Sequence, residues 1–402
     1  MFTRKIIVIT LIIICLGICS AIAYYLTTYT SANKVSESKQ SGQINLQNAS
    51  FAVIYSDAMR QGAEIVTYNS SGKILDKKAL DGGRALYHTE ENGGDYYIAS
   101  ERQNHHFKLT KTGEIISFYG PAIYDKDRAI GTSFIRRSND YMFYSMNMGL
   151  HPKYSPDRYS NELVYWNDKT HLNNHIILPG YFQSAVEMDD KAYVLYIDES
   201  IEKVGIYVVD LMKNQLIHDF PIDNHKTSNS DGVYYPTGRF NGSSLQVFQN
   251  RILVLLDGNR PDIEGKPIIQ VINPANGVLE KEIKLSTEGF NLYSSTVYDD
   301  QLYLISSGNQ VNVLDQKFQL HEGLTLEKTT SFMQKVKEQR GSMCGTYLIG
   351  DSVYVLYDFV KNKPADRDRE IHKYNLKTGR EEAVIPLSYK SDKEMISFLV
   401  FQ

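Results

Sequence analysis

The stretch IVTYNSSGKILDKKAL, residues 65–80, contains the unit that decides the fold. In this unit a β-rich run ends in a polar residue, a turn with glycine follows, and a second run ends in an apolar residue. Glycine adopts the positive φ of a tight turn at little cost, so Gly72 predicts a hairpin. The unit recurs as FKLTKTGEIISFYG (107–120), IQVINPANGVLEKEIKL (269–285) and IHKYNLKTGREEAVIPL (371–387), with Gly113, Gly277 and Gly379 at the turns. The chain is therefore expected to repeat one β-hairpin.

Three weaker copies of the hairpin lack the glycine, at residues 206–220, 311–324 and, most weakly, 163–178. Strongly apolar runs precede the hairpins at 95–101, 141–147, 192–198, 252–258, 301–307 and 352–358. Four strands in roughly every 45 to 50 residues is the spacing of β-propeller blades. We therefore predict an all-β fold, a seven-bladed β-propeller over residues 49–402. Six or eight blades are the alternatives if the weakest copy is miscounted.

The two ends of this region predict how the ring closes. The first unit begins at FAVIYSD (51–57) and lacks an innermost strand, whereas the chain finishes with the apolar strand MISFLVFQ (395–402). If the final strand pairs with the first unit, the ring has no free sheet edges. We expect the C-terminal strand to complete the first blade.

The repeated pattern is hydrophobic-x-hydrophobic-hydrophobic-Asp/Asn, followed by glycine and an apolar strand. In this pattern residues 51–402 resemble the β-propeller superfamily of YVTN-type and quinoprotein-like repeats. The Gly-His and Trp-Asp marks of WD repeats are absent from the sequence. The resemblance implies an architecture that many functions share, so it does not imply a reaction.

An uncharged apolar run, Ile6 to Leu26, precedes the repeats and is long enough for a membrane-spanning helix. Arg4 and Lys5 stand before the run, and positive residues favour the cytoplasmic side. Residues 1–29 are therefore predicted to be a cytoplasmic stub and signal-anchor helix, with the rest of the chain outside the cytoplasm at the cell membrane. A signal peptide cleaved near Ala21-Ile22-Ala23 and a lipoprotein signal ending at Cys19 are the alternatives.

Residues 30–48, TSANKVSESKQSGQINLQN, are polar and show no apolar periodicity. Such a segment buries too little surface to order itself, so it is predicted to be a flexible stalk.

Charge and cysteine content narrow the class of protein. The net charge of −4 comes from 43 basic and 47 acidic residues spread along the chain, so nucleic acid is not an expected partner. Cys15 and Cys19 lie in the apolar run, which leaves Cys344 alone in the repeats and allows no disulfide there. This pattern favours a bacterial cell-surface protein over a disulfide-rich secreted one.

The sequence contains no motif that predicts a cofactor, a metal site or catalysis. The loop 258–267 has the wrong glycine spacing for a phosphate loop, and its acidic side chains are read as solvated. The alternative for that loop is a Ca²⁺ site made by Asp257, Asn259, Asp262 and Glu264. His105-His106 has no partner motif for a metal, and Cys344 is expected to be a buried, inert thiol. The sequence therefore predicts no catalytic residue, no metal site and no cofactor.

The candidate site comes from the long loops, which should all lie on one face of a propeller, where loops often carry function. Several bring an Arg close to an innermost strand, with aromatic residues nearby. The predicted ligand-binding residues are Arg84, Arg128, Tyr124, Tyr235, Arg239 and Arg340. Such a mouth suits a carboxylate, a phosphate or a peptide, unless each Arg pairs with an acidic residue of the neighbouring blade. The loop segment 327–345 is also expected to contain a short helix with Phe332 and Val336 on one side and Met333 as a further candidate for that side.

The function predicted from these features is that of a membrane-anchored binding or scaffold domain for a protein, a peptide or a small anionic ligand. The alternative is a propeller enzyme, a lactonase-like hydrolase or a quinone-dependent dehydrogenase, with a metal site at the channel mouth. The innermost strands show no repeated acidic position, which disfavours that alternative. A third possibility is an accessory subunit that docks in a membrane complex through its helix.

Overall fold

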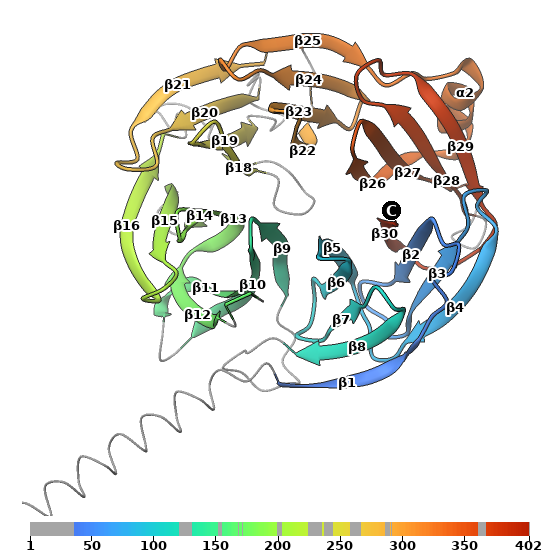
Figure 1. Cartoon of the computed structure of the whole chain (residues 1–402), viewed down its shortest axis with the longest axis horizontal. Helices are drawn as coiled ribbons and strands as arrows, with labels where there is room; N and C mark the ends of the chain where they lie inside the picture. The colour runs from blue at the N-terminus through green and yellow to red at the C-terminus, as the bar shows by residue number, and fades with distance from the viewer. Residues whose placement is uncertain are drawn as a thin grey trace, which may run out of the picture.

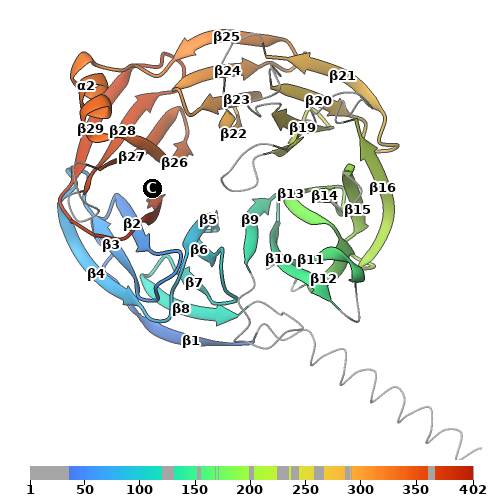
Figure 2. The same ribbon diagram turned by 180° about the vertical axis from the view of Figure 1, so that it is seen from behind.

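Seven antiparallel sheets form a closed ring, so the prediction of seven blades is confirmed over six or eight (Figure 1). The computed structural model describes residues 36–119, 131–151, 155–167, 169–170, 172–198, 203–223, 235–236, 244–257, 267–285, 290, 292–360 and 367–401. Figure 2 shows the same ring from the opposite side. We number the blades in chain order.

The strands of each blade follow one another from the axis outward. Blade 1 contains β30 (Met395–Val400), β2 (Phe51–Ser56), β3 (Ala63–Tyr68) and β4 (Ile74–Leu80). Blade 2 contains β5 (Leu86–Asn92), β6 (Asp95–Ser100), β7 (His106–Leu109), β8 (Glu114–Tyr119) and β1 (Ser36–Gln43). Blade 3 contains β9 (Thr132–Ser138), β10 (Tyr141–His151), β11 (Ser155–Asn167) and β12 (Leu172–Pro179). Blade 4 contains β13 (Tyr181–Met188), β14 (Lys191–Asp198), β15 (Lys203–Asp210) and β16 (Gln215–Ile222).

The remaining three blades repeat the arrangement. Blade 5 contains β17 (Tyr235–Pro236) and β18 (Leu245–Phe248), which both pair with β19 (Arg251–Asp257), then β20 (Ile268–Ile272) and β21 (Leu279–Lys284). Blade 6 contains β22 (Leu292–Tyr298), β23 (Gln301–Ser306), β24 (Gln310–Leu314) and β25 (Leu320–Thr325). Blade 7 contains β26 (Ser342–Ile349), β27 (Ser352–Val360), β28 (Arg367–Asn375) and β29 (Glu381–Leu387).

The ring closes as the sequence predicts. Strand β30 pairs with β2 over its whole length, from Phe51 opposite Val400 to Ser56 opposite Met395. The N–H of Phe401 then donates to the carbonyl of Ser50 at 2.9 Å. The last strand is therefore the innermost strand of the first blade.

The core lies between the blades. Seven apolar clusters are found, one at each interface between neighbouring blades. Each blade is apolar on both faces because both are covered by a neighbour, and burial of that surface is the main stabilising term. This explains why the second strand of most blades reads as an almost unbroken apolar run, such as KAYVLYID in β14.

The connections divide between two faces. Connections between blades, and between the second and third strands of a blade, lie on one side, which we call the loop face. The tight turns lie on the other side, the turn face. The predicted turn glycines Gly72, Gly113, Gly277 and Gly379 have φ of 78°, 86°, 72° and 70°, which confirms their role.

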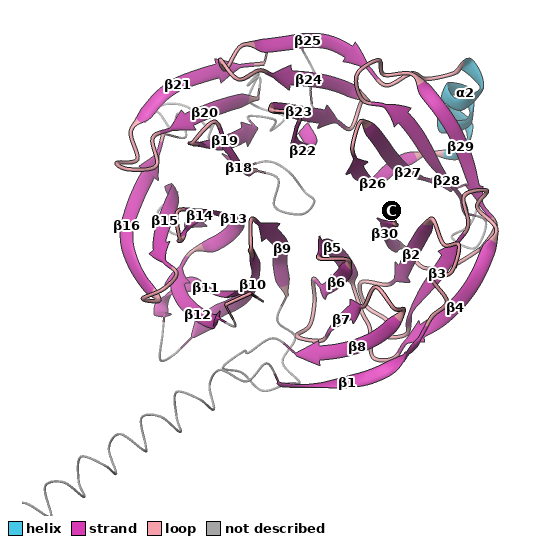
Figure 3. Cartoon of the chain, viewed as in Figure 1, coloured by secondary structure: helices cyan, strands magenta, loops and turns pink. Residues whose placement is uncertain are grey.

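One predicted loop helix is present, α2 (Thr330–Gln339), which lies beside blade 7 (Figure 3). Thr329 caps it by accepting the N–H of Phe332 at 3.2 Å. Phe332 is buried and meets the rings of Tyr357 and His372, while Met333 is largely exposed. Phe332 and Val336 therefore form the packed side, and Met333 lies off it.

The N-terminal part differs from the expectation in one respect. Part of the predicted stalk is strand β1, which pairs with the outer edge of β8. The free backbone groups of an edge strand can pair with a polar segment, so no apolar periodicity is needed. The predicted membrane helix lies outside the described residues, and within those residues no helix is long and apolar enough to cross a bilayer.

Candidate functional site in the central channel

Of the six predicted mouth residues, the structure describes the side chains of Arg84 and Arg340, and it does not bring these two together. Arg84 lies on the loop face, where its Nε donates to the carbonyl of Ala58 at 2.8 Å. It lines a pocket of about 380 Å³ with Arg102, Asn147 and Tyr181, among others. Arg340 is elsewhere: it ends α2 in a left-handed conformation and does not line that pocket.

The other four predicted residues cannot be placed in a site. Tyr124, Arg128 and Arg239 lie outside the described residues. Tyr235 belongs to β17, where its backbone pairs with Asp257, and its side chain is not described. The predicted aromatic mouth therefore stays a prediction.

A second pocket, of about 330 Å³, lies in the central channel and is built by innermost strands of blades 2, 3, 5, 6 and 7. Its lining includes two acidic and two basic residues from neighbouring blades, Glu90 and Glu91 on β5 and Arg136 and Arg137 on β9. Glu91 and Arg137 pair with each other at 3.5 Å. Polar side chains cover much of the remaining wall. They are Thr89, Gln246, Ser294, Ser295, Thr296, Thr346 and Tyr347.

Burial changes the acid–base behaviour of Glu90 and Arg136. Burial raises the pKa of Glu90 to about 7, and the positive charge of Arg136 only partly opposes this. Burial also lowers the pKa of Arg136 to about 10, which still leaves the guanidinium protonated at neutral pH. The channel thus holds a permanent cation beside a carboxyl group that titrates near neutrality.

Hydrogen bonds hold Arg136 in place across three blades. Its guanidinium donates to Ser184 Oγ at 2.9 Å, to the Leu245 carbonyl at 2.6 Å and to Gln246 Oε1 at 2.7 Å. Gln246 Nε2 in turn donates to Ser295 Oγ at 2.7 Å. This belt links blades 3, 4, 5 and 6 around the channel and presents the cation in a fixed position.

The channel pocket continues toward the turn face. A third pocket, of about 500 Å³, shares Glu91, Tyr347 and Leu348 with the channel pocket. Its lining also includes Gly94 and Lys111, which belong to tight turns of blade 2. The two pockets therefore adjoin, and the third pocket lies nearer the turn face.

The sequence contained both channel residues but gave no signal for them as a pair. Glu90 and Arg136 stand on innermost strands, and no acidic position repeats on those strands from blade to blade. The site instead uses different residue types from different blades. The adjacent acidic pair of β5 and the adjacent basic pair of β9 were the available signal.

The histidine pair has a structural explanation. His106 is buried, accepts the N–H of Ser100 at 3.0 Å and lies 2.9 Å from Tyr144 Oη. Burial lowers its pKa to about 3. His105 instead stacks on Tyr119, with ring centroids 5.0 Å apart. In the part of the chain that the structure describes, no three His, Cys, Asp or Glu side chains gather into a possible metal site.

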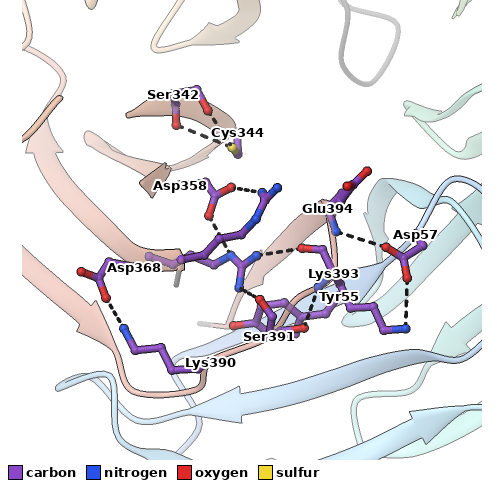
Figure 4. A network of polar contacts seen from close by, with 12 residues as sticks. Tyr55, Asp57, Ser342, Cys344, Asp358, Asp368, Lys390, Ser391, Lys393 and Glu394 are labelled. Carbon is purple, nitrogen blue, oxygen red and sulfur yellow. Dashed lines mark hydrogen bonds and ion pairs between the residues drawn. The ribbon is translucent and has the colours of Figure 1, made fainter. Parts of the chain in front are cut away.

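Cys344 lies next to a second polar cluster, at the junction of blades 7 and 1 (Figure 4). Burial raises the pKa of its thiol to about 11, as expected for an inert cysteine. Beside it, the fully buried Arg369 pairs with Asp358 at 3.1 Å and donates to the carbonyls of Ser391 and Lys393 at 3.2 and 2.9 Å. These bonds join blade 7 to the segment that leads into β30, so the cluster secures the closure of the ring.

Taken together, the fold and the site define a seven-bladed β-propeller with a charged central channel. No protein-family model matches the chain, and no curated protein matches it in sequence. Among solved structures it is similar to AztD of Citrobacter koseri, with 12% identity, 88% of this chain and 99% of that chain covered, and a TM-score of 0.43.

Two other similar structures are propellers or enzymes of different kinds. The Cps50 (Swd1) β-propeller domain of Myceliophteria thermophila has 9% identity, 76% and 88% coverage of the two chains and a TM-score of 0.49. The dihydro-heme d1 dehydrogenase NirN has 11% identity, 90% and 77% coverage and a TM-score of 0.42. Such distant likenesses carry no argument about function, and the description of this chain as a propeller rests on its own seven sheets.

Proposed function

We propose that this protein is a membrane-anchored, extracytoplasmic binding domain whose central channel takes up a small anionic ligand. The observation that supports this most directly is the pair of Arg136 and Glu90 in one polar pocket. The anchor is proposed from the apolar run of residues 6–26.

The sign of the charge on the ligand follows from the protonation states that Arg136 and Glu90 can adopt. Arg136 keeps its charge at every physiological pH and repels a cation. Glu90, with a pKa of about 7, can take up a proton and then donate a hydrogen bond to an anion. The site can adapt to a carboxylate or a phosphate by protonation of Glu90, whereas the fixed charge of Arg136 opposes a cation.

The hydroxyl groups of the wall fit the same ligand class. Ser and Thr hydroxyls can donate to an anion as well as accept from hydroxyl groups on the ligand. Pockets with a few converging polar groups are the usual form of a small-molecule site. The ligand is therefore expected to carry one anionic group and further polar groups.

A binding screen on the full-length chain in detergent tests the proposal. Inorganic phosphate, mono- and dicarboxylates and primary amines are compared by calorimetry near pH 6.5. We expect at least one anion to bind and the amines to fail. Arg136→Met should weaken anion binding about 10- to 100-fold, since charge-assisted hydrogen bonds contribute about 1.5 to 3 kcal/mol.

Arg251→Met is the matched control, because Arg251 on β19 lies outside the pocket lining and pairs with Glu280 at 2.5 Å. It should change affinity little. Circular dichroism verifies that both variants are folded. If no anion binds, or if Arg136→Met binds as well as the wild type, the proposed site is wrong.

A further inference from the structure

The direction of strand β1 shows on which side the N-terminal segment reaches the propeller. Ser36 lies opposite Tyr119 and Gln43 opposite Glu114. Glu114 follows the tight turn at Gly113, so it stands at the turn face, whereas Tyr119 ends β8 at the loop face. The chain therefore enters β1 from the loop face, on the outer edge of blade 2 (Figure 1).

The end of β1 is fixed to the body of the propeller. Ile44 is 1% exposed and packs in the cluster between blades 1 and 2. The N–H of Asn45 donates to Asp76 Oδ2 at 2.8 Å, and Thr67 Oγ1 donates to the carbonyl of Asn45 at 3.2 Å. These contacts hold the segment after β1, so β1 does not end in a free linker.

Little chain is left between the proposed anchor and β1. If the anchor comprises residues 1–29, only the six positions 30–35 separate it from Ser36. The seven Cα–Cα steps from residue 29 to residue 36 reach at most about 25 Å. The eight residues of β1 themselves extend about 26 Å along the height of the blade. With the turn face toward the membrane, this short segment would have to run almost fully extended over the whole height of the blade, whereas with the loop face toward the membrane it has no such height to cover.

We infer that β1 holds the propeller with its loop face toward the membrane and its turn face toward the surrounding medium. The inference rests on the membrane anchor of the proposed function. The orientation determines the side from which a ligand enters the channel. The pocket that includes Gly94 and Lys111 opens on the turn face, so a water-soluble ligand reaches Glu90 and Arg136 from the side away from the membrane.

Fluorescence quenching in nanodiscs tests this orientation. The full chain, with Cys15, Cys19 and Cys344 replaced by Ser, carries a single labelled cysteine. Arg102→Cys places the label on the loop face of blade 2, and Lys111→Cys places it on the turn face of the same blade; both positions are exposed. Lipids with a nitroxide on the head group supply the quencher.

We expect quenching at position 102 to be at least about twofold stronger than at 111, because the two faces are separated by roughly the blade height of 26 Å. Equal quenching, or stronger quenching at 111, overturns the orientation. A flexible Gly/Ser insert between residues 35 and 36 should abolish the difference, since it lengthens the tether. The same insert between residues 43 and 44 leaves the tether length unchanged and should preserve it.

Extraction of membranes with alkaline carbonate tests the membrane anchor separately from the orientation. If the chain is released, the anchor is wrong and the orientation falls with it. If it is retained but the two labels are quenched equally, only the orientation is wrong. Anion binding by the channel is measured in detergent, so its failure is recognised independently of both.

Discussion

The backbone N–H of Ile44 donates to the carbonyl oxygen of Gly113, 2.8 Å away. In blade 7 the equivalent glycine, Gly379, accepts instead from Glu327, just after the outer strand of blade 6. The turn glycine of blade 7 is thus contacted by the segment that follows the outer strand of the preceding blade. In blade 2 the segment after β1 makes this contact instead. The N-terminal segment is a component of the propeller wall.

Gly113→Ala should destabilise the fold by about 3 kcal/mol. A Cβ at this position would lie 2.2 Å from the carbonyl oxygen of Ile44, and φ is +86°. Gly93→Ala is the control, because its φ is +63° but nothing lies within 4 Å, so only about 1 kcal/mol is expected. Denaturant unfolding measures both, and equal losses would contradict the close approach of Ile44.

Arg369→Met should lower the free energy of unfolding by about 1.5 to 3 kcal/mol, because it removes the charged hydrogen bonds to Ser391 and Lys393 and one of the two partners of Asp358, which keeps its ion pair with Arg367. Lys390→Met is the comparison. Lys390 also forms an ion pair, with Asp368, but it is more than half exposed and should cost less than about 1 kcal/mol. Similar effects in chemical denaturation would show that the buried cluster does not secure the ring.

His88→Leu should reduce the sensitivity of the fold to acid. His88 is buried, and burial lowers its pKa to about 4, below the ordinary 6.5. Its neutral form therefore contributes stability that is present above pH 6.5 and is lost as the pH falls toward 4. Thermal melting between pH 7 and 4 should fall less steeply in the variant. An unchanged slope would mean that His88 does not titrate in this range.

The pattern of the sequence predicted the repeat and its closure because both depend on local features. Turn glycines such as Gly72 and the unpaired apolar strand at 395–402 are visible in short windows. Strand β1 was missed because it forms through backbone pairing with β8, which leaves no apolar signature. The channel site was missed because Glu90 and Arg136 are distant in sequence and are brought together only by the closed ring.

Glu90→Gln should make the protein more stable above pH 7 and leave it nearly unchanged at pH 5. The folded-state pKa of Glu90, about 7, lies above the ordinary 4.5. The stability present below pH 4.5 therefore decreases as the pH rises through 7, and a neutral amide avoids this loss of about 1 to 2 kcal/mol. Glu338→Gln is the control, because Glu338 is exposed on α2 and lies outside the channel lining. Identical pH profiles of wild type and Glu90→Gln would contradict the raised pKa.

The most direct test of the channel site is proton uptake on binding, measured by calorimetry at pH 7.5 in buffers of different ionisation enthalpy. An anion beside Glu90 raises the pKa of that carboxyl further, so the wild type should take up a fraction of a proton with each bound carboxylate, a ligand that does not itself titrate near this pH. Glu90→Gln should bind with no uptake. Binding that is independent of the buffer in the wild type, or equal uptake in both proteins, would contradict a site built on Glu90 and Arg136.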